Sequence, residues 1–165
     1  MEVEAKFRID ENIKERVEKI AEFVKEVFEE DYYLKHPCRD FMRTDEALRI
    51  RKSEKIVLTY KGPKVDKETK TREEIEVVVS DFENTLEIFK RLGFDVVAKV
   101  SKVRRIYKLD DMKILVDSVE GLGDFVEIEI KSDDVEKAKR RIFEIARRMG
   151  LKESITKSYL EMLLE

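Results

Sequence analysis

Charged and apolar residues alternate one by one at the start of the chain. Glu2, Glu4 and Lys6 are each separated by a single apolar residue. Side chains at positions i and i+2 of a β-strand lie on the same face, so this spacing predicts a strand with one charged face and one apolar face. The same spacing returns in three later pairs of like charge: Arg49 and Arg51, Lys102 and Arg104, and Glu127 and Glu129.

The sorting of these charges by sign separates two interpretations. One such strand is explained by an antiparallel sheet with one face in water, where charges form cross-strand pairs. A solvated face gains nothing, however, from placing like charges together within a strand. A barrel with a charged interior can use that arrangement, because ions and ligands of opposite sign neutralise each group. Unpaired ions are too costly to bury, so we expect this interior to hold water, metal and ligand.

The candidate residues for such an interior are of two kinds. Five are carboxylates: Glu2, Glu4, Asp117, Glu127 and Glu129. Seven are cations: Lys6, Arg49, Arg51, Lys61, Arg72, Lys102 and Arg104. Carboxylate oxygens suit Mg²⁺ or Mn²⁺, and guanidinium groups bind phosphate oxygens in pairs. Without a nucleophilic Ser-His or Cys-His pair, this set indicates metal-assisted phosphoryl or nucleotidyl transfer.

The composition limits the compartment and the partners. The 165 residues suit a single domain, 1–165, with a core of its own. The 35 basic and 38 acidic residues nearly cancel, so a net charge of -3 gives no general attraction to nucleic acid or to anionic membrane. The lone Cys38, the absence of a long apolar run and the lack of a signal peptide together predict a cytoplasmic protein. Abundant Lys and Glu resemble the composition of hyperthermophile proteins.

The element pattern predicts an α+β fold with about eight strands. The expected strands are residues 2–9, 31–36, 46–53, 55–61, 69–79, 94–109, 112–118 and 124–131. Helices are expected after Asp10 with apolar spacing through Val24 and Val27, from Ser80 or Asp81 to Gly93, from Asp133 or Asp134 to Gly150, and after Ser154. Short connections favour antiparallel pairing, and eight strands suffice for an eight-stranded antiparallel β-barrel with flanking helices. The apolar side of the last helix either belongs to the core or forms a homodimer contact.

Several motifs in chain order resemble those of the CYTH domain, also called the triphosphate tunnel metalloenzyme fold. They are Glu2-x-Glu4-x-Lys6, Leu48-Arg49-Ile50-Arg51, Thr59-Tyr60-Lys61-Gly62-Pro63, Thr71-Arg72-Glu73-Glu74, Lys102-Val103-Arg104, Val116-Asp117, and Glu127-Ile128-Glu129 after Gly121-Leu122-Gly123. The resemblance spans nearly the whole chain and implies a tunnel-forming barrel that binds a triphosphate with Mg²⁺ or Mn²⁺.

The same resemblance implies a role for each matching residue. It implies four catalytic residues: Glu2, Glu4, Lys6 and Asp117. It implies five metal ligands: Glu2, Glu4, Asp117, Glu127 and Glu129. The phosphates would be held by Lys6, Arg49, Arg51, Lys61, Arg72, Lys102 and Arg104, with Glu74 as a further carboxylate.

One segment of the chain bears on which triphosphate is the substrate. The segment from Tyr32 to Phe41 looks most like that of prokaryotic class IV adenylyl cyclase-like members, which implies conversion of ATP to cyclic AMP and pyrophosphate. Two alternatives stay open. One is hydrolysis of thiamine triphosphate or tripolyphosphate, and the other is a module that binds a nucleotide or polyphosphate without turnover.

Overall fold

A computed structural model describes all 165 residues of the chain. Its eight strands are β1 (Glu2–Arg8), β2 (Glu22–Lys35), β3 (Ala47–Lys52), β4 (Ile56–Lys61), β5 (Glu74–Val79), β6 (Asp95–Leu109), β7 (Met112–Val119) and β8 (Gly123–Lys131). They form one antiparallel sheet in the order β1-β8-β7-β6-β2-β3-β4-β5. The predicted eight-stranded antiparallel sheet is therefore confirmed.

Five helices accompany the sheet. They are α1 (Glu11–Ile20), α2 (Phe41–Thr44), α3 (Phe82–Arg91), α4 (Val135–Arg148) and α5 (Tyr159–Leu163). Asp10, Asp81 and Asp134 cap the three long helices, because each carboxylate accepts a hydrogen bond from a backbone N–H in the first turn. None of the five helices has both the length and the apolar character needed to cross a membrane.

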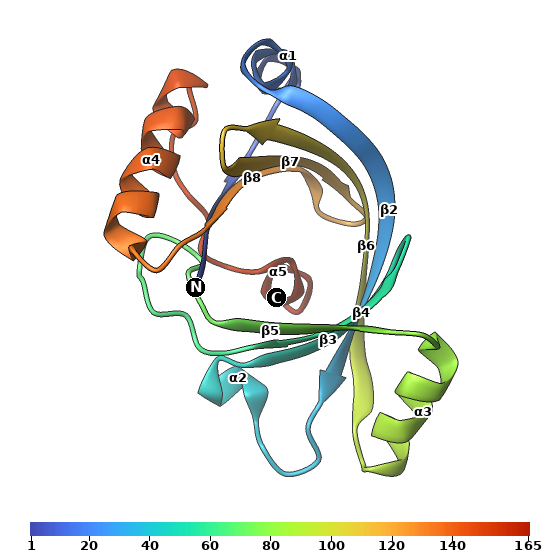
Figure 1. Cartoon of the computed structure of the whole chain (residues 1–165). Coiled ribbons are helices and arrows are strands. Elements are labelled where there is room, and N and C mark those ends of the chain that lie inside the picture. Colours follow the sequence, from blue (N-terminus) through green and yellow to red (C-terminus); the bar gives the residue numbers. More distant parts are fainter.

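The sheet curls into a ring, which Figure 1 shows along its axis. The edge strands β1 and β5 are not neighbours in the sheet, and the segment 69–72 before β5 lies along β1 instead. The backbone N–H groups of Glu2 and Arg72 each donate to the other's carbonyl at 3.2 Å. The N–H of Lys70 donates to the carbonyl of Glu4 at 2.9 Å. This short segment therefore joins the two ends of the curled sheet.

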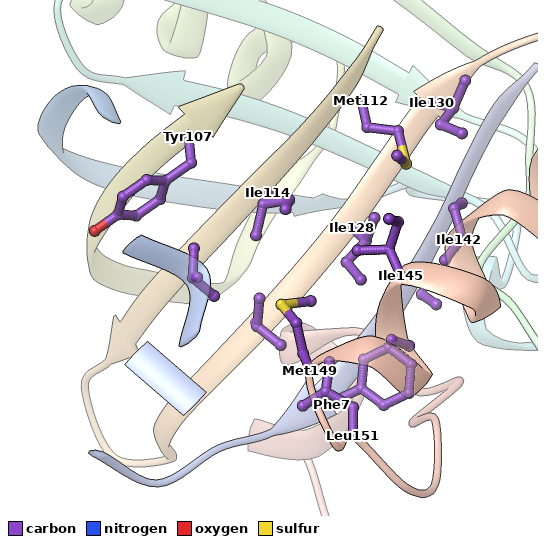
Figure 2. Close-up of a cluster of buried hydrophobic side chains, with 14 of the residues drawn as sticks. Phe7, Tyr107, Met112, Ile114, Ile128, Ile130, Ile142, Ile145, Met149 and Leu151 are labelled. Carbon is purple, nitrogen blue, oxygen red and sulfur yellow. The ribbon is translucent and has the colours of Figure 1, made fainter. Parts of the chain in front are cut away.

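The largest apolar core lies outside the ring. It contains 18 buried residues from β1, β6, β7 and β8, from the helices α1 and α4, and from the residues just after α4. Figure 2 shows Ile128 and Ile130 of the sheet facing Ile142 and Ile145 of α4. Each fully buried side chain of this size contributes about 1.5–3 kcal/mol. Because strand side chains alternate, this apolar outer face leaves the charged residues of β1 and β8 on the inner face.

The last helix lies inside the ring (Figure 1). Tyr159 is buried there in a small cluster with Tyr33, Ala47 and Phe125, among others. Ser158 begins the helix with a capping box, in which its hydroxyl accepts from the N–H of Glu161 and that carboxylate accepts from the N–H of Ser158. The apolar side of this helix thus packs against the inner wall of the ring.

Two expectations about the elements are wrong. The helix after Asp10 ends at Ile20, and β2 begins at Glu22, so Val24 and Val27 lie in a strand. Pairing with β6 along almost the whole of β2 overrides the helical spacing of those two residues. The expected strand 69–79 is also divided, because only residues 74–79 form β5 while 69–72 lie along β1.

Asp66 fixes the turn that leads into the closing segment. Its carboxylate accepts hydrogen bonds from the N–H groups of Glu68 and Thr69, from the Thr69 hydroxyl and from Lys139. Partial burial raises the pKa of Asp66, but the hydrogen bonds from Lys139, Thr69 and the backbone outweigh this and lower it to about 2. The ionised carboxylate is therefore the form that stabilises the turn.

We predict that Asp66→Asn lowers the free energy of unfolding at pH 7 by about 1–3 kcal/mol, as expected for lost hydrogen bonds to a charged group. Since the pKa is lower in the folded state, the contribution of Asp66 is complete above about pH 4 and is lost as the pH falls toward 2. Thermal unfolding of both proteins between pH 2 and 7 tests this. The gap in melting temperature should shrink at the acid end, and a gap that is the same at every pH would contradict the account.

Candidate functional site

A cavity of about 210 Å³ lies inside the ring and is lined mainly by charged side chains. Its 24 lining residues include eight carboxylates and nine cations, but only six are hydrophobic. Eight of the twelve candidate residues come from the paired-charge positions of β1, β3, β6 and β8, whose alternation turns these side chains inward. The nearly equal numbers of each sign make internal pairing possible and allow so many ions to be enclosed.

Three carboxylates gather at one place in this cavity. Oxygen atoms of Glu2, Glu4 and Glu129 lie within 4.8 Å of one another. Burial, together with the charges of Glu129 and Glu4, raises the pKa of Glu2 to about 10. Burial and the charge of Glu4 raise the pKa of Glu129 to about 7. Neither Glu2 nor Glu129 forms an ion pair with a basic side chain, and Glu4 pairs only with Lys70. The three carboxylates thus share one basic partner, and their oxygen atoms fit a divalent cation.

Asp31 organises part of the cationic wall. Arg51 donates to both of its oxygens, at 2.7 and 2.9 Å, and Lys102 donates to one of them at 2.7 Å. Glu29, two residues earlier on the same face of β2, lies 3.5–3.6 Å from Arg51, Lys102 and Arg104. One of its oxygens, Oε1, is buried without a hydrogen bond. These two carboxylates hold the cations of β3 and β6 in fixed positions.

Arg49 differs from its neighbours because no carboxylate lies within ion-pair distance of it. The residue is only 5% exposed. Its Nη2 donates one long hydrogen bond of 3.4 Å to the hydroxyl of Thr59, and its buried Nε has no partner. A buried guanidinium with free donors is costly unless an anion completes its hydrogen bonds. Arg49 is thus the cation in this wall that is most available to a ligand.

Lys6 and Asp117 lie behind the last helix and do not line the cavity. The ammonium of Lys6 donates to the carbonyl of Lys157 at 2.7 Å and lies 3.8 Å from the ring centre of Tyr159. Burial and the nearby charge of Lys70 lower the pKa of Lys6 to about 6. Asp117 accepts two hydrogen bonds of 2.7 Å from Arg104 and one from the hydroxyl of Tyr159. Tyr159 thereby separates both residues from the open space.

The remaining predicted residues line the cavity, but other groups of the protein already occupy part of their hydrogen-bonding capacity. Arg72 donates to the carbonyls of Gly62 and Asp45, at 2.6 and 2.8 Å, and so connects two loops. Lys61 pairs with Glu74 at 2.7 Å. Arg104 also donates to Glu127 at 2.7 Å. The structure therefore brings together all the predicted residues of the site except Lys6 and Asp117, which are covered by the last helix.

Four residues of the site were missed in the sequence: Glu29, Asp31, Lys70 and Tyr159. Three of them carried the same spacing signal as the others, because Glu29 and Asp31, like Lys70 and Arg72, stand two residues apart. The helical spacing that continues to Val27 hides Glu29 from this signal, whereas Asp31 and Lys70 lie within the expected strands 31–36 and 69–79. Tyr159 has no such signal, because its place depends on where the last helix packs.

Comparison with known proteins agrees with this arrangement. Residues 1–159 match the family described as the CYTH domain. A protein of Methanocaldococcus jannaschii, named provisionally as an adenylate cyclase, is 44% identical over 171 residues, with 98% of each chain covered.

Two solved structures extend the comparison. A protein of Pyrococcus horikoshii has a TM-score of 0.95 and 44% identity, covering 99% of this chain and 98% of its own. A Hippeastrum protein, named provisionally as an adenylyl cyclase and described as having a dominant triphosphatase activity, has a TM-score of 0.74 and 20% identity, covering 97% of this chain and 93% of its own. At that identity the likeness concerns the fold alone. The match along nearly the whole length, together with the close archaeal relative, shows that this chain belongs to the CYTH domain family.

Proposed function

We propose that this protein is a metal-dependent enzyme that acts on a triphosphate inside the ring, and that hydrolysis of the triphosphate chain is its reaction. One observation carries the proposal. The cavity combines three clustered carboxylates, of which only Glu4 has a basic partner, with a buried guanidinium, that of Arg49, which lacks an anion. A divalent cation and a polyphosphate would supply both missing charges at once.

The size and lining of the cavity favour a polyphosphate chain. Its volume of about 210 Å³ is below the roughly 300–1,000 Å³ of pockets that enclose drug-sized ligands. The lining contains no Asn, Gln, His or Trp, and its two aromatic residues that could stack on a base, Tyr33 and Tyr159, are buried together in one cluster. Phosphate recognition needs only cations and N–H donors, which the lining supplies in number.

In the proposed reaction, the carboxylates would bind the metal and the cations would bind the phosphates. Glu2, Glu4 and Glu129 would hold Mg²⁺ or Mn²⁺, which supplies Lewis-acid polarisation and charge neutralisation when bound. Arg49 and its cationic neighbours would bind the phosphate oxygens and stabilise the charge that grows on the leaving diphosphate. Asp31 and Glu29 would keep those cations preorganised, so little reorganisation is needed during the reaction.

Cyclisation of ATP is the second candidate, and the name of the 44% identical archaeal relative supports it. In that reaction the ribose 3′-hydroxyl attacks the α-phosphorus, and pyrophosphate leaves. The same cations would stabilise the leaving pyrophosphate. The nucleoside, however, needs space beyond the present cavity, which the last helix partly fills.

A product assay distinguishes these reactions. The protein is incubated with tripolyphosphate, thiamine triphosphate or ATP, each with Mg²⁺ and with Mn²⁺, and both inorganic phosphate and cyclic AMP are measured. We expect metal-dependent release of phosphate, with the largest kcat/KM for tripolyphosphate. Cyclic AMP as the main product would instead establish the cyclase. Tight binding of every triphosphate without any product would contradict an enzymatic function.

The carboxylate cluster provides a second prediction. Glu2→Gln combined with Glu4→Gln should lower turnover at least about 100-fold, because even the loss of residues that only support metal ligands costs 10–100-fold. Thermal unfolding should show that the fold is retained. Glu73→Gln is the matched control, since Glu73 is exposed beside the same end of the ring but outside the cavity lining. Equal turnover in the double variant and the control would rule out the cluster as the metal site.

Arg49 provides a third prediction. Arg49→Met should weaken binding of a non-hydrolysable triphosphate analogue about 10- to 100-fold, as expected for lost hydrogen bonds between charged groups. Because Arg49 makes only one long hydrogen bond in the free protein, the melting temperature should change little. Isothermal titration calorimetry measures the binding. Arg49→Lys should recover only part of the affinity, since an ammonium lacks the paired donors of a guanidinium. Unchanged affinity in Arg49→Met would refute this role.

A further inference from the structure

The ammonium of Lys70 lies between two of the predicted metal-binding carboxylates. Its Nζ is 2.6 Å from Oε1 of Glu4 and 3.0 Å from Oε2 of Glu127. All three residues are buried. Glu127 has a second partner in Arg104, but Lys70 is the one basic side chain within ion-pair distance of Glu4. The charge of Glu4 is thus balanced locally by a lysine from the same chain.

The backbone holds Lys70 in this position. The segment 69–72 runs antiparallel to β1, and the N–H of Lys70 donates to the carbonyl of Glu4. Thr69 and Thr71 are linked through their hydroxyls at 2.5 Å on one side of the segment, and Lys70 between them points into the cavity. The four-carbon stem of a lysine can still move its ammonium several ångströms while the backbone stays in place.

We propose that Lys70 is an internal counter-ion that competes with the divalent cation for Glu4 and thereby couples metal binding to triphosphate binding. The inference rests on the proposed function, because it assumes that both ligands enter this cavity. A divalent cation bound by Glu4 meets a positive charge only 2.6 Å from that carboxylate. The metal must therefore displace the ammonium or bind against its repulsion. Either requirement weakens the binding of metal alone.

A triphosphate changes this balance. Its oxygens offer the displaced ammonium a new set of acceptors in the same cavity, so Lys70 can leave Glu4 without losing a partner. Metal then binds more tightly when triphosphate is present, and triphosphate binds more tightly when metal is present, by the same factor. Such coupling favours loading of the complete metal-triphosphate pair over either component alone.

The test measures the affinity for Mn²⁺ by isothermal titration calorimetry, without and with a saturating methylene-bridged triphosphate analogue. In the wild-type protein we expect the analogue to tighten Mn²⁺ binding by a factor within the usual range of about 5–150. Lys70→Met should bind Mn²⁺ alone about tenfold more tightly than wild type. The factor by which the analogue tightens Mn²⁺ binding should fall toward one in this variant. Lys70→Gln is measured in parallel, because its polar side chain suits a wet cavity if the methionine variant does not fold.

Lys113→Met is the matched control. Lys113 lines the same cavity and is paired with Glu129 in the β7–β8 register, but it forms no ion pair within 4.0 Å. Removing its charge should raise Mn²⁺ affinity only slightly, by about twofold, and should leave the coupling intact. An equal effect of both substitutions would show a general charge effect and would overturn the counter-ion role. Unchanged or weaker Mn²⁺ binding in the Lys70 variants would overturn it as well.

The two proposals fail in different ways. If the wild-type protein binds Mn²⁺ and the analogue but the Lys70 variants keep the wild-type coupling, only the counter-ion role is wrong. If the wild-type protein binds neither ligand, the proposed function is wrong and the counter-ion role falls with it. Because the readout is binding and not turnover, an inactive variant still gives a decisive result.

Discussion

Charge balance inside a ring of strands governs this molecule. Carboxylates and cations face one another across a small cavity, and most of them form ion pairs there. Buried ions are tolerated only when each has partners of opposite sign, because the cost of removing them from water is large. The pairing is incomplete at two places. Glu2 and Glu129 have no basic partner in their cluster with Glu4, and the guanidinium of Arg49 has no acidic partner. A ligand that completes the pairing must therefore supply positive charge to the carboxylates and negative charge to Arg49.

Stability and function occupy opposite faces of the same sheet. The outer face of β1, β7 and β8 packs against α1 and α4 in an apolar core of 18 residues, which provides the main hydrophobic contribution to folding. This leaves the inner face free to carry charges that contribute little net stability. The segment 69–72 closes the ring and also brings Lys70 to the carboxylates, so the closure of the fold and the electrostatics of the cavity depend on the same short stretch.

Much of this arrangement could be predicted from the sequence, since strand alternation alone assigns Glu2, Glu4, Arg49 and Arg51 to one face. The eight strands and their antiparallel pairing followed from the same signal together with the turn residues. The prediction of a helix through the segment 22–28 is wrong, because its apolar spacing fits a helix and only pairing with β6 makes it a strand. Burial of Lys6 and Asp117 beneath the last helix depends on packing between distant segments, which no local pattern records.

A crystal structure with Mn²⁺ and a methylene-bridged triphosphate analogue tests the central claim most directly. Anomalous scattering locates manganese without ambiguity. The account predicts manganese on the carboxylates of Glu2, Glu4 and Glu129, with analogue oxygens on the guanidinium of Arg49. Manganese or analogue bound only on the outer surface, with the cavity still closed to both, would contradict it.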